Sequence, residues 1–94
     1  ETTVPQQQLF VLNSPFMIEQ AKAFAARLQD EAPENDEARI RRAFQLAYAR
    51  PPSELESKIG LSYLNREQDP ANNLSQWQSY AQVLLGSNEF MYLD

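Results

Sequence analysis

The chain has 94 residues, of which 43% are hydrophobic, and its 13 acidic and 8 basic side chains give a formal net charge of -5. This length allows one hydrophobic core of moderate size, and the hydrophobic fraction is typical of a folded protein rather than of a disordered tail. The acidic balance disfavours binding to nucleic acid or to an anionic membrane through the overall electrostatic field, so we expect neither partner.

Two residue types that carry much of protein chemistry are absent. The sequence contains no cysteine and no histidine. Disulfides, thiolate metal sites, covalent haem attachment and cysteine nucleophiles are therefore excluded within this chain, and it lacks the commonest general base. No apolar run approaches the length of a membrane span, so we expect no membrane insertion. We also expect no catalytic residue, no metal site and no cofactor in this chain.

The first two predicted helices each follow a capping residue and have a proline in their first turn. Thr3 precedes a helix over 4–12, and Ser14 precedes a helix over 15–30 that starts at Pro15. Proline suits the first turn because it lacks the amide hydrogen that this turn leaves without a partner. In the second helix apolar residues recur at steps of three and four, which predicts one buried face. Its members are Met17, Ala21, Phe24 and Leu28.

A proline pair separates the third predicted helix from the fourth. The third runs over 36–49, and the prolines at 51–52 end it because a residue before proline is pushed out of the helical region. Ser53 and Glu56 then form a capping box for a helix over 54–66. The predicted buried stripes are Ile40, Ala43, Phe44 and Ala47 in the third helix, and Leu55, Ile59 and Tyr63 in the fourth.

The last predicted helix, over 74–86, follows the longest loop, the polar segment NREQDPANNLS. We expect Gly86 to end this helix in a left-handed conformation. The predicted inward-facing residues are Leu74, Trp77, Ala81 and Leu84. Beyond the helix we expect a short terminal turn held by Phe90 and Tyr92.

The predicted fold is all-α. No segment alternates for long with the period of two that strands require, and glycine is almost absent. We therefore expect a compact bundle of about four to five helices with a short terminal turn, which forms a single domain over 1–94.

Arginines are the strongest candidates for a binding site. The candidate contacts for an anion or a partner are Arg39, Arg42 and Arg50. A guanidinium group matches phosphate, sulfate and carboxylate groups. The alternative, which we favour, is structural: Asp36 with Arg39 and Glu37 with Arg41 have the spacing of helix-surface ion pairs. In the same way, we interpret Arg50 and the prolines after it as a hinge between helices rather than as a site.

Oxygen-rich features give weaker indications. The loop DPANN offers Asp69, Asn72 and Asn73 as calcium ligands, but it lacks the alternating spacing and the terminal glutamate of a calcium loop. We predict a turn and a helix cap there. Glu54 and Glu56 point in different directions on a helix and do not form a general acid–base pair. We expect that the chain alone is not an enzyme.

Three blocks, which together span nearly the whole chain, carry a family resemblance. They are TTVPQQQLFVLNSPFMIEQAKAFAARL, RIRRAFQLAYARPPSELE and WQSYAQVLLGSNEFMYLD. In that order they resemble the C-terminal region of a domain of unknown function that is common in planctomycete bacteria. The first and last blocks are the more specific. The family usually has a glycine in place of Ala49 and often an asparagine in place of Gly86.

The resemblance implies that the chain is the C-terminal piece of a longer, multidomain, exported protein. Such proteins often carry a cytochrome-c-like domain near their start, so any haem binds upstream and the chain is extracytoplasmic. No catalytic residue is carried over from the family. The partners implied are the upstream domains of the same polypeptide.

Two functions remain open at this point. In the first, the chain is a non-catalytic module that completes or docks the C-terminal end of the exported protein. In the second, it forms one wall of an enzyme or anion-binding site that the upstream chain completes, with Arg39, Arg42 or Arg50 as anion holders. An exposed apolar patch without a pocket favours docking, whereas a cleft rimmed by arginines favours the second function.

Overall fold

Four helices make up the described part of the chain. The computed structural model describes residues 14–87, so the predicted helix over 4–12 and the terminal turn at Phe90 and Tyr92 lie outside the described residues. The helices are α2 (Pro15–Glu31), α3 (Asp36–Tyr48), α4 (Glu54–Leu64) and α5 (Gln76–Leu85). No strand occurs within 14–87. The all-α prediction is confirmed.

Side-chain caps set where the helices begin. The Oγ of Ser14 accepts a hydrogen bond from the Met17 amide at 3.2 Å, and Ser53 forms the predicted capping box with Glu56. Ser75 forms a second capping box with Gln78, so α5 begins at Gln76, two residues later than the predicted start at 74. Each cap satisfies amide groups that the first turn leaves without a helical partner.

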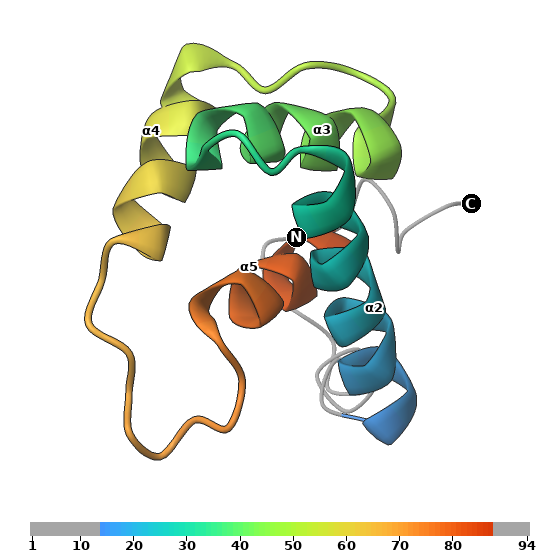
Figure 1. Ribbon diagram of the computed structural model, residues 1–94, viewed down its shortest axis with the longest axis vertical. Coiled ribbons are helices and arrows are strands. Elements are labelled where there is room, and N and C mark those ends of the chain that lie inside the picture. Colours follow the sequence, from blue (N-terminus) through green and yellow to red (C-terminus); the bar gives the residue numbers. More distant parts are fainter. Residues whose placement is uncertain (1–13, 88–94) are drawn as a thin grey trace, which may run out of the picture.

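The helices form a frame around a shared core (Figure 1). In this view α3 crosses the top, α2 and α4 run down opposite sides, and α5 lies between them. α5 contacts all three of the other helices, and its contact with α2 is the most extensive. The last helix of the described chain therefore holds the first three together.

Two groups of buried side chains form the core. The larger group consists of Leu28, Ile40, Ala43, Phe44, Tyr80 and Leu84, which come from α2, α3 and α5. The smaller group consists of Ala21, Ala25 and Ala81. Because these three side chains are small, α2 and α5 can approach closely where they cross. The predicted buried faces are confirmed for most positions of α2, α3 and α5, although Phe24, Ala47 and Trp77 are only partly buried.

The predicted buried stripe of α4 is wrong for Leu55 and Ile59, although Tyr63 does pack against the core. Leu55 is 66% exposed and Ile59 is 59% exposed, whereas Gly60 is buried and Leu61 packs against the core. A Cβ atom at position 60 would lie 2.5 Å from the hydroxyl oxygen of Tyr80. α4 therefore presents its glycine to α5, and this close approach turns the Leu55 side of the helix outward.

A left-handed residue ends α3 and not α5, where it was predicted. Gly86 ends α5 as predicted, but its φ of -89° and ψ of 0° are right-handed, so the predicted left-handed conformation is wrong. Ala49 instead takes the left-handed conformation, with φ 58° and ψ 33°, at the end of α3. The chain must leave α3 there to reach the extended conformation that the proline pair requires. This is the position at which the family resemblance places a glycine.

Candidate functional site

The arginine–proline corner is closed by contacts among its own residues. Arg50 donates through Nη1 to Oε1 of Glu56 at 2.8 Å and through Nη2 to Oε2 at 2.9 Å. The Ser53 amide donates to the same Oε1 at 2.8 Å. The hydrogen bonds from Arg50, and then that from Ser53, lower the pKa of Glu56 from its ordinary 4.5 to about 2. This carboxylate therefore caps α4 and anchors Arg50 at once.

Aromatic rings connect the corner to the rest of the fold. The Arg50 guanidinium lies 5.5 Å from the ring centre of Phe44 and 5.6 Å from that of Tyr48. The Tyr48 hydroxyl donates to the Leu84 carbonyl at 2.7 Å and shares a hydrogen bond with Ser87 Oγ at 2.7 Å. The corner thus links the end of α3 to the start of α4 and to the end of α5.

Arg39 serves the junction between α2 and α3. Its Nε donates to the carbonyl of Ala32 at 3.0 Å, and its Nη1 lies 3.5 Å from Oδ1 of Asp36. The guanidinium also lies 5.3 Å from the ring centre of Trp77, and only 13% of the side chain is exposed. Trp77 Nε1 donates to the same Asp36 oxygen at 3.1 Å. These contacts include the predicted ion pair between Asp36 and Arg39.

Arg42 binds the last residue of α2. Its Nε lies 2.8 Å from Oε1 of Glu31, and Nε of Arg27 lies 2.6 Å from the other oxygen. Hydrogen bonds from the two arginines lower the pKa of Glu31. The three candidate arginines therefore each pair with a different carboxylate of the chain. The other predicted pair, Glu37 with Arg41, does not form among the described residues.

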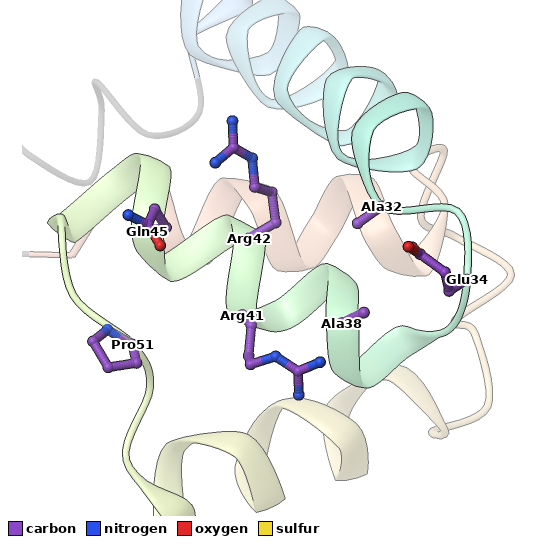
Figure 2. A pocket seen from close by; sticks show the side chains of 7 residues that line it. All are labelled: Ala32, Glu34, Ala38, Arg41, Arg42, Gln45 and Pro51. Atoms are coloured by element: carbon purple, nitrogen blue, oxygen red, sulfur yellow. The ribbon is translucent and has the colours of Figure 1, made fainter.

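A shallow hollow of about 330 Å³, which we call the α3 hollow, lies beside the corner (Figure 2). It is lined by Ala32, Glu34, Ala38, Arg41, Arg42, Gln45 and Pro51. In this view the guanidinium of Arg42 points toward α2, whereas that of Arg41 points in the opposite direction, toward α4. The carboxylate of Glu34 stands on the rim and repels an anion. The lining groups therefore do not converge on a single anion. Among the three candidate arginines only Arg42 lines this hollow, beside Arg41, for which the sequence predicted an ion pair with Glu37.

A second surface feature is the outer side of α4, which we call the α4 face. Its residues are Leu55, Lys58, Ile59, Ser62, Tyr63 and Arg66. All but Leu55 line a shallow hollow of about 340 Å³. The guanidinium of Arg66 lies 4.4 Å from the centre of the Tyr63 ring. Sequence periodicity found this stripe but assigned it to the core, because periodicity identifies an apolar face without showing what covers it.

The polar loop between α4 and α5 uses its oxygens internally. Oδ1 of Asp69 accepts from the Ala71 amide at 3.0 Å, and Oδ1 of Asn72 accepts from the Leu74 amide at 3.0 Å. The predicted turn is present, with the Asn72 amide donating to the Asp69 carbonyl. The predicted helix cap within DPANN is wrong, because Ser75 caps α5. Within 14–87, no three acidic side chains are grouped so that they could hold a metal ion. No helix in this part of the chain is both long enough and apolar enough to span a membrane.

Comparison with known proteins places the chain in a family. Residues 1–64 match the model of PSD1, described as a protein of unknown function (DUF1553). The chain belongs to the PSD1 family. The PSD1 match includes α2, α3, the corner and α4, and it ends at the last residue of α4, so α5 lies outside the matched residues. No similar curated protein and no similar solved structure was found.

Proposed function

We propose that this chain is a non-catalytic helical module that docks against other domains of its parent polypeptide. The observation that carries the proposal is the α4 face, on which Leu55 and Ile59 are exposed on successive turns. A single exposed leucine is ordinary on a protein surface. Two large apolar side chains aligned beside a half-buried tyrosine instead indicate an interaction surface.

The parent polypeptide, in this proposal, is a large exported planctomycete protein with a cytochrome-c-like domain upstream. The family resemblance supports this context, and membership of the PSD1 family is compatible with it. The module lies at the C-terminal end and outside the cytoplasm. It binds no cofactor, because any haem is held by the upstream domain.

One observation favours the alternative, in which the chain forms a wall of an enzyme or anion-binding site. This is the α3 hollow, which Arg41 and Arg42 line together with Pro51. The contacts weigh against it, because Arg42 already pairs with Glu31 and the two guanidinium groups point apart (Figure 2). Docking through the α4 face is therefore the function that the geometry supports best.

The test is a binding titration of the 94-residue chain with the upstream domains of its parent polypeptide. The double substitution Leu55→Ser and Ile59→Ser is expected to raise Kd at least about tenfold, because it removes the apolar contacts. Both side chains are exposed, so unfolding free energy is expected to change by only about 0.5 kcal/mol. The matched control is Val83→Ser on α5, which is 55% exposed and lies outside the α4 face.

The two results that oppose the proposal are clear. Docking through the α4 face is wrong if the unsubstituted 94-residue chain does not bind the upstream domains. It is also wrong if the double variant binds them as tightly as the unsubstituted chain does. An equal loss of affinity in the Val83→Ser control would show that the effect is not specific to this face.

A further inference from the structure

The α4 face differs in charge from the rest of the molecule. Five of the eight basic residues pair with a carboxylate among the described residues: Lys22, Arg27, Arg39, Arg42 and Arg50. The other three are Arg41, Lys58 and Arg66, and two of them belong to the α4 face. The face thus has two basic groups without a carboxylate partner, in a chain whose net charge is -5.

The nearby acidic residues of α4 do not neutralise these groups. Glu56 is held by both guanidinium nitrogens of Arg50 and by the Ser53 amide. Glu54 lies one turn before Lys58, but no ion pair joins them within the described structure. Glu67 follows Arg66 in the sequence, and among the described residues no ion pair joins these two either. Lys58 and Arg66 are therefore both available to pair with carboxylates of a partner.

The basic groups frame the apolar stripe. Lys58 lies between Leu55 and Ile59 in the sequence, and Arg66 stacks on Tyr63 just beyond the end of the helix. The stacking holds the Arg66 guanidinium beside the stripe. Lys58 and Arg66 are about two helical turns apart in the sequence. A partner helix with carboxylates about two turns apart, on either side of apolar side chains, has the complementary pattern.

We propose that the α4 face binds an acidic amphipathic helix, in which apolar side chains that cover Leu55 and Ile59 are flanked by carboxylates that pair with Lys58 and Arg66. This inference rests on the proposed docking function and adds the chemistry of the partner. The carboxylates set the orientation and the rate of association, whereas the apolar contacts supply most of the affinity.

Charge argues against two other occupants. A second copy of the chain that paired through its own α4 face would bring like charges together, since both charged side chains of the face are basic. An anionic membrane is attracted by about 1 kcal/mol for each basic residue near its surface. Two such residues give a small attraction, which the net charge of -5 opposes.

The experiment extends the titration of the 94-residue chain with the upstream domains to two salt concentrations, about 50 mM and about 500 mM. The double substitution Lys58→Glu and Arg66→Glu is expected to raise Kd at least about tenfold at low salt, and high salt is expected to weaken binding of the parent chain. The matched control is Lys22→Glu on α2, which reverses an exposed charge outside the α4 face and is expected to leave Kd unchanged.

The outcomes separate this inference from the docking function. If Leu55→Ser with Ile59→Ser weakens binding but neither charge reversal nor salt does, docking stands and the acidic partner is wrong. If none of these changes weakens binding, docking through the α4 face fails as well. A parallel titration with vesicles of phosphatidylcholine and phosphatidylserine is expected to show no binding. Vesicle binding that Lys58→Glu abolishes would overturn the inference in favour of a membrane.

Discussion

At the scale of single residues, Ala49 carries the clearest backbone strain in the described chain. Its φ of 58° places an L residue in the left-handed region, where the Cβ atom is crowded by the backbone. Glycine has no such penalty. The sequence predicted that the chain stops at this corner, because the proline pair is a local signal. It did not predict the left-handed conformation of Ala49, because that conformation depends on the direction in which the chain leaves α3.

The first prediction is that Ala49→Gly stabilises the protein by about 0.5–1 kcal/mol. Relief of the left-handed strain exceeds the extra entropy that glycine gives the unfolded chain. Urea unfolding measures the change. The matched control is Ala26→Gly, an exposed position inside α2, which is expected to destabilise the protein by about 0.5–1 kcal/mol. Equal destabilisation by both substitutions would contradict the left-handed conformation of Ala49.

The second prediction concerns the pH dependence that Glu56 confers. Its pKa is about 2 in the folded protein, below the ordinary 4.5. The stabilisation is therefore complete above pH 4.5 and is lost as the pH falls toward 2. We expect this stabilisation to be about 1 kcal/mol, because about a third of the Glu56 side chain is exposed and solvent screens the pair.

Urea unfolding at several pH values between about 6 and about 2.5 tests this prediction. Glu56→Gln is expected to reduce the loss of stability on acidification, and Arg50→Gln is expected to reduce it to a similar extent because it removes the main cause of the low pKa. If both variants lose stability with the same slope as the parent chain, the corner pair does not contribute to folding.

At the scale of elements, local sequence signals determine where helices begin, whereas tertiary contacts determine which side of a helix is buried. The starts of α2 and α4 were predicted correctly, because Ser14 and the capping box of Ser53 and Glu56 are signals within four residues of the helix start. The start of α5 was placed two residues too early. The orientation of α4 was not predicted correctly, because the helix offers two apolar sides, one with Leu55 and Ile59 and one with Leu61 and Leu64. Packing of Gly60 against Tyr80 decides between them, and that contact joins two helices across the long polar loop, which no local signal describes.

The third prediction tests the close approach of α4 and α5. Gly60→Ala places a methyl group 2.5 Å from the Tyr80 hydroxyl oxygen and 3.0 Å from Cδ1 of Ile40. We expect a loss of about 1–3 kcal/mol from overpacking, although alanine favours a helix by about 1 kcal/mol. Thermal unfolding measures it. Adding Tyr80→Phe removes the nearest atom and is expected to recover part of the loss.

A control substitution on the exposed side of α4 shows whether the effect of Gly60→Ala is specific to the contact with α5. Ser62→Ala changes an exposed position of the same helix and is expected to alter stability by at most about 0.5 kcal/mol. If Gly60→Ala behaves like Ser62→Ala, α4 does not approach α5 through its glycine, and the outward orientation of Leu55 and Ile59 loses its structural basis.

At the scale of the whole molecule, the PSD1 match ends before the last helix that contributes to the core. The match ends with α4, yet α5 contacts all three preceding helices and contributes to both groups of core residues. The single helical domain predicted from the sequence includes α5. The ion pairs of Arg42 and Arg50 could not be predicted from the sequence. Their partners do not have the three- or four-residue spacing of helix-surface pairs, and only the folded chain brings them together.

The fourth prediction is that a chain shortened to residues 1–64 does not fold cooperatively. The shortened chain lacks Tyr80 and Leu84, each of which stabilises the core by about 1.5–3 kcal/mol on burial. This loss is large because the whole unfolding free energy of a domain is only about 5–15 kcal/mol. Circular dichroism is expected to show reduced helix content and no sharp thermal transition. The control is the 94-residue chain cleaved once between Gln68 and Asp69, which keeps α5 and is expected to stay folded. A sharp transition of the shortened chain near that of the parent would mean that α5 is dispensable.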